Sequence, residues 1–291
     1  NDQVKFNIEE HGMIDITTDS CNDLSQELLD RFKIRAIPLQ VIINDKAYKD
    51  GVDISIDKLF QYVDQTKQLP KTSAPSIQEF IDFFSAETED SIFISISSQL
   101  SATNANAKLS SQSVQNKKVH IIDSLNLSTG IGLLVCKAAE LRDKGLSADE
   151  ILKEVEATIP RVRTSFVIDT LEYLYMGGRC SAMQNVVGSI LRIRPIIQVR
   201  PDGTLGIKEK ITGARKKALD AILSDFAKHK DKADLQRVFV THTGCADDAE
   251  YLRNSLLNIA PIQYVYITTA GATIASHCGP NTIGILYLEK A

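Results

Sequence analysis

The stretch SIFISISSQLSAT at residues 91–103 constrains the fold of this chain more than any other. It opens with a run of β-branched and aromatic residues at 92–96, which predicts a buried strand. The hydroxyl side chains of Ser97, Ser98, Ser101 and Thr103 follow, and then a helical pattern. In an open α/β sheet, a turn between a strand and a helix lies at the carboxyl end of the strand, where ligands bind. Because this turn carries no charged residue, a ligand there would be held by hydroxyl and backbone N–H groups.

The first half of the chain alternates between predicted strands and predicted helices. Strands are predicted at 13–18, 35–43, 92–96 and 119–122, and helices at 24–32, 56–63, 76–84, 127–144 and 147–159. Ser76 with Glu79 and Ser147 with Glu150 form capping boxes, which mark the starts of two helices. This alternation predicts an α/β fold with a largely parallel sheet flanked by helices.

Pro160 marks the predicted boundary between two α/β domains, at 13–160 and 161–291. Strands are predicted at 164–168, 193–199, 204–211, 238–241, 264–268 and 282–288, and helices at 171–175, 186–192, 213–228 and 247–257. The turn Pro201-Asp202-Gly203 joins two of these strands into a hairpin, so the second sheet is expected to be mixed. Residues 1–12 are polar, and we interpret them as an extension or the remnant of a tag.

Composition and cysteine pattern exclude several classes of function. The net charge of −4 disfavours nucleic acid as the main partner, since binding to phosphates requires an excess of Lys and Arg on one face. No apolar run reaches about 18 residues, so neither a transmembrane helix nor stable membrane anchoring is expected. The five cysteines are scattered without metal-ligand spacing, which indicates reduced thiols in a cytoplasmic protein and no metal site.

The familiar catalytic and nucleotide-binding motifs are absent from the sequence. Short polar turns recur in the first half instead: Asp19-Ser20, Thr72-Ser73, the turn at 97–101, and Asp123-Ser124 with Ser128-Thr129. Taken one at a time, each turn is more simply a helix cap or an Asx turn. Gathered at one edge of a sheet, hydroxyls beside helix N-termini would form a receptor suited to a carboxylate or a phosphate.

Three charged or titratable side chains are further candidates for a site. His277 is followed by glycine and proline, which predicts a tight loop just before the last strand. Arg179 follows two glycines, so it is either a solvated arginine after a helix C-cap or a bidentate donor to an anion. Arg215 belongs to a basic cluster at the start of a helix, which is either a solvated face or a surface for a partner.

Five motifs, in this order, resemble those of the DegV family and together span residues 13–288. TSAPS at 72–76 resembles TSxPS, SSQLSAT at 97–103 resembles SSxLSGT, and residues 123–130 resemble DSxxxSxG. LEYLYMGGR at 171–179 resembles LxYLxKGGR, and HCGPNTIG at 277–284 resembles HxGPGxxG. Ala102, Met176 and Asn281 stand where the family usually has glycine, lysine and a second glycine.

This resemblance implies a two-domain fold with a long-chain fatty acid buried between and within the domains, and no other cofactor. Members of the family act as the acyl-carrying subunit of a bacterial fatty acid kinase. They present the carboxylate to a separate ATP-dependent kinase subunit, which makes acyl phosphate. By resemblance, the carboxylate ligands would be Thr72, Ser73, Ser97, Ser98, Ser101 and His277, and the residues facing the kinase subunit would be Arg179 and Arg215.

The chemistry of these residues agrees with an acyl carrier. A buried carboxylate requires hydrogen-bond donors, and hydroxyls with one histidine supply them. Burial of an acyl chain gains ~0.8 kcal/mol per CH₂, or roughly 10 kcal/mol for about 16 carbons before the costs of binding. Two alternatives stand beside this interpretation. One is an enzyme acting on a small carboxylate or phosphate ester with His277 as acid or base, and the other is an interaction domain.

Overall fold

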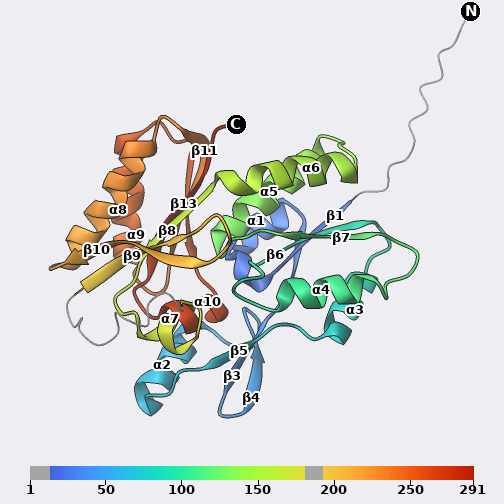
Figure 1. Cartoon of the computed structure of the whole chain (residues 1–291), viewed down its shortest axis with the longest axis horizontal. Helices are drawn as coiled ribbons and strands as arrows, with labels where there is room; N and C mark the ends of the chain where they lie inside the picture. Colours follow the sequence, from blue (N-terminus) through green and yellow to red (C-terminus); the bar gives the residue numbers. More distant parts are fainter. Residues whose placement is uncertain (1–13, 181–192) are drawn as a thin grey trace, which may run out of the picture.

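The structure, a computed structural model, describes residues 14–180 and 193–291 (Figure 1). The N-terminal half of the chain, blue to green, lies beside the C-terminal half, yellow to red. Each half is built around a sheet of its own, and a smaller third sheet lies below them in the view. The chain therefore has the α/β architecture that the alternation of strands and helices predicts.

The sheet of the N-terminal half is parallel throughout. Its strands are β1 (Asp15–Asp19), β2 (Ile34–Ile37), β6 (Ser91–Ser95) and β7 (Val119–Asp123), in the order β2-β1-β6-β7. All three pairings are parallel, and every residue of β6 is buried. The prediction of a parallel sheet around the 92–96 run is confirmed, and the carboxyl ends of β1, β6 and β7 lie at one edge.

Helices cover both faces of this sheet. They are α1 (Gln26–Arg31), α3 (Ile77–Ser85), α4 (Thr103–Ser111), α5 (Thr129–Asp143) and α6 (Ala148–Thr158). The two predicted capping boxes are present at the starts of α3 and α6. Phe93 packs with α3 and α4, whereas its neighbours Ile92 and Ile94 belong to the core cluster that contains α5. This alternation is the expected consequence of a strand that is buried on both faces.

A small antiparallel sheet contradicts the prediction of one continuous strand over 35–43. The chain leaves β2 at Ile37, and after Pro38 it enters β3 (Gln40–Ile43), which pairs with β4 (Lys46–Lys49) and β5 (Lys71–Ser73). Proline cannot donate to a strand ladder, so it separates two strands that belong to different sheets. Helix α2 (Ile56–Thr66) follows β4 and packs onto this unit.

The sheet of the C-terminal half is mixed, as the predicted hairpin requires. Its strands are β8 (Val162–Val167), β9 (Ile193–Val199), β10 (Leu205–Thr212), β11 (Ala233–His242), β12 (Tyr264–Thr269) and β13 (Ile283–Glu289). They lie in the order β10-β9-β8-β13-β11-β12, and only β11 and β12 pair in parallel. The helices of this half are α7 (Glu172–Met176), α8 (Arg215–His229), α9 (Ala246–Ile259) and α10 (Ala272–Cys278). The helix predicted at 186–192 and the extension at 1–12 lie outside the described residues.

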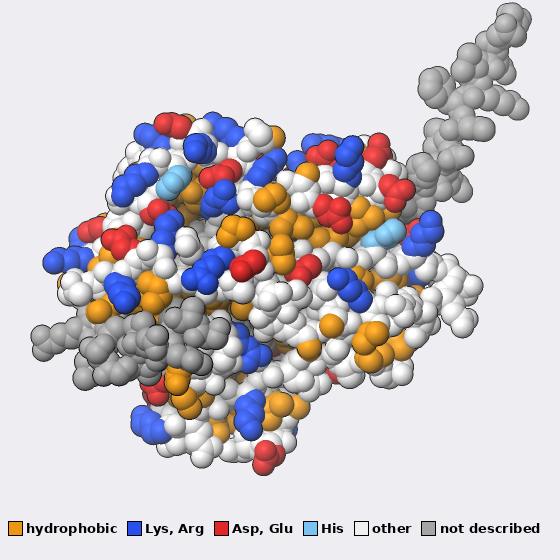
Figure 2. Space-filling view, in the orientation of Figure 1, with side chains coloured by type: hydrophobic (Ala, Val, Ile, Leu, Met, Phe, Trp, Pro, Cys, Tyr) orange, Lys and Arg blue, Asp and Glu red, His pale blue; other side chains and the backbone are white. Residues whose placement is uncertain are grey.

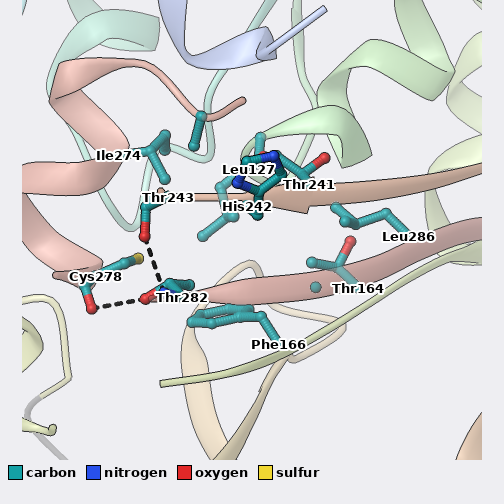
Figure 3. Close-up of a pocket in the computed structure, with 13 residues that line it drawn as sticks. Leu127, Thr164, Phe166, Thr241, His242, Thr243, Ile274, Cys278, Thr282 and Leu286 are labelled. Atoms are coloured by element: carbon teal, nitrogen blue, oxygen red, sulfur yellow. Dashed lines mark hydrogen bonds between the residues drawn. The ribbon is translucent and has the colours of Figure 1, made fainter. Parts of the chain in front are cut away.

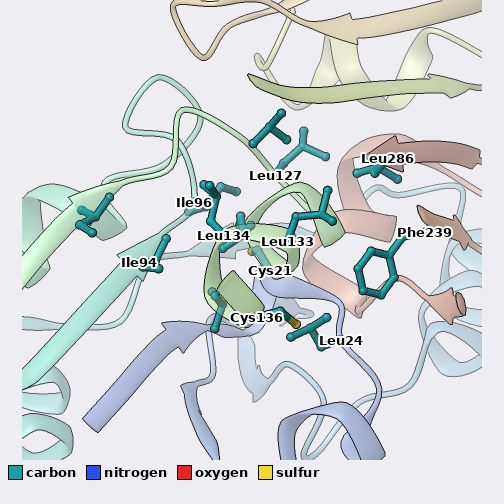
Figure 4. Packing of buried hydrophobic residues seen from close by; sticks show 14 of the residues in the cluster. Cys21, Leu24, Ile94, Ile96, Leu127, Leu133, Leu134, Cys136, Phe239 and Leu286 are labelled. Atoms are coloured by element: carbon teal, nitrogen blue, oxygen red, sulfur yellow. The ribbon is translucent and has the colours of Figure 1, made fainter. Parts of the chain in front are cut away.

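Helix α5 joins the two halves through a shared core. Leu286 and Leu288 of β13 belong to the cluster that contains α5, whereas Ile285 and Tyr287 belong to the cluster formed with α8 and α9. Figure 4 shows this shared core, in which Leu133 and Leu134 of α5 lie between Ile94 and Ile96 on one side and Leu286 and Phe239 on the other. The boundary predicted at residue 160 stays a prediction; the short 3₁₀ helix η2 (Ile159–Arg161) links α6 to β8 there.

Candidate functional site

A cavity of about 300 Å³ lies where the two halves and the small sheet meet. Its wall contains the end of β5, the turn after β6, the start of α4, the loop after α7, and α10. The lining residues are Leu39, Thr72, Ser73, Ala74, Ile96, Leu100, Ser101, Ala102, Asn106, Leu127, Leu174, Arg179, Leu205, Thr273, Ile274, His277 and Cys278. Several are hydrophobic, and the polar ones include four of the residues that the sequence predicts for a carboxylate site: Thr72, Ser73, Ser101 and His277.

Thr72 and His277 form a hydrogen-bonded pair in this wall. The hydroxyl Oγ1 of Thr72 lies 2.7 Å from Nε2 of His277. Thr72 is held by the pairing of β5 with β3, in which it lies opposite Val41. His277 occupies the last turn of α10, a helix where the sequence predicts a tight loop. The sequence therefore identifies His277 but misses the helix that positions it.

The surroundings of His277 favour its neutral form. Burial lowers the pKa of His277 to about 4, and the positive charge of Arg179 adds to this effect. Its second ring nitrogen, Nδ1, is buried and has no hydrogen-bond partner among the described residues. Gly177 approaches this nitrogen so closely that a Cβ built on the glycine would lie 2.4 Å from Nδ1. The imidazole ring of His277 therefore occupies space that any side chain at position 177 would fill.

Arg179 lies at the cavity rather than on a surface remote from it. Its Nε donates to the backbone carbonyl of Leu100 at 3.2 Å, and its Nη1 donates to the carbonyl of Gly177. Burial lowers the pKa of this arginine from its usual value, yet an arginine remains charged at any physiological pH. Arg179 therefore places a positive charge beside His277, at the polar end of the cavity.

Ser101 and Ser73 line the cavity but already have partners within the chain. The Ser101 hydroxyl lies 2.8 Å from that of Thr103 and accepts from the Thr103 N–H, which fixes the turn before α4. The Ser73 hydroxyl donates to the carbonyl of Ala74 at 3.1 Å. Asn106 is a lining residue that the sequence analysis misses; its Nδ2 donates to the carbonyl of Pro75. A ligand would have to share these hydroxyls with the protein.

Among the described residues, Ser97 and Ser98 do not line this cavity. Ser97 is fully buried, and its hydroxyl donates to the carbonyl of Gly203, at the tip of the β9–β10 hairpin, at 2.9 Å. Figure 1 shows this hairpin reaching from the C-terminal sheet to the N-terminal half. Ser98 is exposed, and its backbone N–H donates to the carboxylate of Asp123. Ser97 thus joins the two halves, and the carboxylate role predicted for this pair of serines has no support from their position.

Arg215 is bound within its own half of the chain. Its guanidinium donates to Asp169 at 2.8 Å, to Asp248 at 2.6 Å and to the backbone carbonyl of Asn281 at 2.8 Å. These bonds join the start of α8 to α9 and to the loop before β13. With its charge balanced by two carboxylates, Arg215 is poorly placed to recruit a partner, and the prediction that it faces one remains untested.

A small chamber of about 20 Å³ adjoins the apolar side of the cavity. Leu127, Ile274 and Cys278 line both spaces. Figure 3 shows the chamber: Ile274 and Cys278 lie at one end, and Leu286 and Thr164 lie toward the other. The polar group of a ligand at Thr72 and His277 can therefore be followed by an apolar tail that points between the two sheets.

Comparison with known proteins gives this arrangement a family. The family model described as "Uncharacterised protein, DegV family" matches residues 13–290. This chain belongs to the DegV family. It is 34% identical over 281 residues to a DegV domain-containing protein of Caldanaerobacter subterraneus, which covers 95% of this chain and 99% of that protein.

Solved DegV structures share the fold over nearly the whole chain. A DegV family protein from Thermus thermophilus, described by its fatty acid binding, has a TM-score of 0.88 and 30% identity over 96% of this chain and 100% of its own. DegV of Bacillus subtilis, described as a fatty acid binding protein, has a TM-score of 0.86 and 30% identity over 95% of this chain and 99% of its own. The architecture of two main sheets with a small third sheet is thus a DegV fold.

The three departures from the DegV motifs leave the cavity wall in place. Asn281 has a φ of 57°, in the left-handed region, which asparagine tolerates better than most residues. Its N–H donates to the carbonyl of Thr243 at 2.8 Å, so the turn expected of glycine is kept. Ala102 lines the cavity beside Ser101, and Met176 is 67% exposed at the end of α7.

Two buried carboxyl groups hold the start of α10, the DegV helix that carries His277. Asp23 accepts from the N–H of Gly271 at 2.8 Å and from the hydroxyl of Ser128 at 2.6 Å. Asp50 accepts from the N–H of Ala272 at 2.7 Å. Burial raises the pKa of both, that of Asp23 to about 8. Sequence patterns did not single out either residue, because each contacts α10 across more than two hundred positions.

Residues 14–180 and 193–291 contain no group of three His, Cys, Asp or Glu side chains that could hold a metal ion. No helix within these ranges is long and apolar enough to cross a membrane. On the face in Figure 2, Lys and Arg side chains are interspersed with Asp and Glu rather than gathered into one basic surface.

Proposed function

We propose that this protein binds one long-chain fatty acid, with the carboxylate at Thr72, Ser101, Arg179 and His277 and the acyl chain along the apolar wall. The observation that carries the proposal is the Thr72–His277 pair beside Arg179, at one end of a cavity that adjoins an apolar chamber. The arginine balances the charge of the carboxylate, and the hydroxyl and imidazole supply hydrogen bonds without further charge.

The energetics favour an acyl chain over a short carboxylate in this cavity. Each buried methylene contributes ~0.8 kcal/mol, so most of the affinity would come from the chain rather than from the head group. A neutral His277 adds no charge that must be removed from water. The carboxylate can therefore be held and still be released when a partner competes for it.

The comparisons support the same ligand class. Two structures that are 30% identical to this chain over nearly its full length are described by fatty acid binding. Their described ligand is the one that the polar end and the apolar chamber of this cavity would suit.

The proposal extends to the use of the bound acid. The protein would present the carboxylate to a separate ATP-dependent kinase subunit, which forms the acyl phosphate, while this chain acts as a non-catalytic carrier. All five cysteines are free, so we place this exchange in a reducing cytoplasm. With a pKa of about 4, His277 is neutral near pH 7, so it holds no imidazolium proton to transfer and is a weak base. This disfavours the alternative of an enzyme with His277 as acid or base.

Extraction and reloading test the binding step. Purified protein is extracted with organic solvent, the extract is analysed by mass spectrometry, and the delipidated protein is titrated with palmitate by calorimetry. We expect a fatty acid in the extract and one palmitate bound per chain. A protein that carries none, and takes up none from an excess, would leave the carrier function without support.

A coupled assay tests the kinase step separately. Protein loaded with palmitate is incubated with ATP and an ATP-dependent fatty acid kinase subunit, and acyl phosphate is trapped with hydroxylamine. We expect product only when all components are present. Palmitate binding without any product would restrict the function to fatty acid binding.

A further inference from the structure

Three spaces lie next to one another in the molecule, and each neighbouring pair shares lining residues. The 300 Å³ cavity and the 20 Å³ chamber share Leu127, Ile274 and Cys278. The chamber in turn shares Thr164 with a third space, a cleft of about 520 Å³. An acyl chain that enters from Thr72 and His277 and runs through the chamber would therefore meet Thr164 before it could reach the cleft.

The cleft exists because two neighbouring strands diverge. β8 pairs with β9 only over Ser165–Val167, opposite Ile196–Gln198. On the N-terminal side of Ser165, β8 no longer pairs with β9. Residues of both strands line the cleft there, together with Leu125 and Asn126. Charged side chains also line it: Arg163, Arg200, Lys208, Asp225, Lys232 and Glu289. The lining of the cleft is therefore mixed and far more polar than that of the chamber on the other side of Thr164.

A hydrogen bond between Thr164 and Asn126 lies at the boundary between chamber and cleft. Oγ1 of Thr164 donates to Oδ1 of Asn126 at 2.7 Å, and the N–H of Leu127 donates to the same oxygen at 3.1 Å. Both side chains are 4% exposed. A Cβ built on Gly130 would lie 2.1 Å from this oxygen and 2.8 Å from Oγ1 of Thr164. The pair is thus packed against the bare Cα of Gly130.

We propose that the Asn126–Thr164 pair closes the far end of the acyl channel and sets the longest fatty acid that the protein binds well. This inference rests on the proposed function and adds the residues that determine chain length. To pass the pair, an acyl chain must separate a buried donor from a buried acceptor. That penalty is comparable with the gain from burying one or two more methylenes.

The hydroxyls around the chamber agree with its role as the place of the terminal methyl group. Thr129, Thr241 and Thr268 form a chain of hydroxyl contacts at 2.7 and 2.9 Å, and Thr243 is bonded to the carbonyl of Gly279. Their hydroxyls are therefore satisfied by one another or by the backbone. Thr241 and Thr243 line the chamber and thus offer it no hydroxyl without a partner, which suits an acyl end.

The proposal is tested by titrating the variant Thr164→Ala with a series of saturated fatty acids. This variant removes the hydroxyl and methyl groups that close the channel beside Asn126. Delipidated wild type and variant are titrated with palmitate, stearate, arachidate and behenate. We expect the ratio of the Kd for behenate to the Kd for palmitate to fall by at least about fourfold in the variant, the factor that one more buried methylene supplies. Ser165→Ala is the matched control. It removes a hydroxyl from the next residue of β8, and this residue lines the cleft but not the chamber.

The outcomes are distinguishable. A folded Thr164→Ala whose chain-length profile equals that of the wild type overturns the proposal and leaves fatty acid binding intact. A shift of the same size in Ser165→Ala also overturns it, since the effect would then not depend on the Asn126–Thr164 pair. If Thr164→Ala does not fold, Thr164→Val removes the donor to Asn126 at nearly constant volume and is expected to shift the ratio in the same direction. A wild type that binds none of the four acids would remove the proposed function itself.

Discussion

Oγ1 of Thr72 lies 2.7 Å from Nε2 of His277, although 205 residues separate the two in the chain. Thr72 belongs to the small antiparallel sheet of the N-terminal half, and His277 to the helix before the last strand of the C-terminal half. The polar end of the cavity therefore forms only when the two halves are docked. Binding of a ligand there should stabilise the docked arrangement, because only that arrangement contains the site.

We predict that Thr72→Val weakens palmitate binding by about tenfold, since it removes one hydrogen bond to a charged group at nearly constant volume. Calorimetric titration of the delipidated protein measures the change. The matched control is Thr88→Val, at an exposed position distant from the cavity lining. Equal affinities for Thr72→Val and the wild type would remove this hydroxyl from the carboxylate site.

His277 should make the stability of the free protein depend on acid pH. Its pKa lies at about 4 in the folded protein against an ordinary 6.5, so the neutral form is favoured by folding. The contribution to stability is complete above pH 6.5 and is lost as the pH falls through about 4. The free energy of unfolding of the wild type should therefore fall relative to that of His277→Gln, by at most about 1.4 kcal/mol per pH unit in that window.

Urea unfolding at several pH values between neutrality and acid measures this difference, with His120→Asn as a control at another histidine. An NMR titration of the His277 ring adds a second measurement. A bound carboxylate would stabilise the protonated ring, so loading with palmitate should raise the pKa of His277. A pKa that is already near 6.5 in the free protein, or that does not move on loading, speaks against the placement of His277.

Asp23 should have the opposite dependence on pH. Burial is the largest cause that raises its pKa, to about 8 from an ordinary 3.8, so folding favours the protonated form. The associated stability is present below pH 3.8 and is lost as the pH rises through about 8. The stability of the wild type relative to Asp23→Asn should consequently fall across that window, again by at most about 1.4 kcal/mol per pH unit.

Thermal or urea unfolding of both proteins across this range checks the sign, and Asp64→Asn at an exposed position on α2 is the control. If the difference in free energy of unfolding between wild type and Asp23→Asn stays constant with pH, Asp23 is ionised in the folded protein across this range. Because Asp23 accepts from Gly271 at the start of α10, the variant also tests how firmly this helix holds His277.

The parallel sheet and the mixed sheet were both predictable from local sequence patterns, namely the alternation of strands and helices and the hairpin turn. The buried run at 92–96 coincides with β6, an inner strand of its sheet, and both capping boxes mark real helix starts. The sequence pattern could not separate β2 from β3, because only Pro38 and Leu39 lie between them and both strands are rich in apolar residues. Which sheet a strand joins is decided by contacts distant in sequence, which local periodicity does not contain.

The candidate site was predictable as a set of motifs but not as a geometry. Thr72 and His277 meet as the motifs suggested, whereas Ser97 lies in a similar motif and yet bonds to Gly203. A hydroxyl-rich turn can bind a ligand or bond within the protein, and its local sequence allows both. For Ser97 the position of the β9–β10 hairpin decides in favour of a bond within the protein. Helix α10 was missed since Ala272–Cys278 is short and has no side-chain cap.

We predict that Ser97→Ala lowers the free energy of unfolding by about 1 kcal/mol, because the buried carbonyl of Gly203 loses its donor. The affinity for palmitate should stay close to that of the wild type, because Ser97 does not line the described cavity. Chemical unfolding and calorimetry measure the two quantities, and Ser98→Ala, at an exposed side chain, serves as the control. A large loss of affinity without loss of stability would return Ser97 to the carboxylate site.

Gly177→Ala tests whether the placement of His277, rather than its presence alone, determines binding. A Cβ at this position would lie 2.4 Å from Nδ1 of His277 and 2.9 Å from the carbonyl of Tyr173, so the imidazole must move. A displacement that breaks the contact with Thr72 should weaken palmitate binding by about tenfold, although no hydrogen-bond donor has been removed. Met176→Ala is the matched control, because that side chain is 67% exposed one residue earlier. Equal affinities in the two variants would show that the cavity tolerates a displaced ring, and that the carboxylate is held by Thr72 and Arg179 without His277.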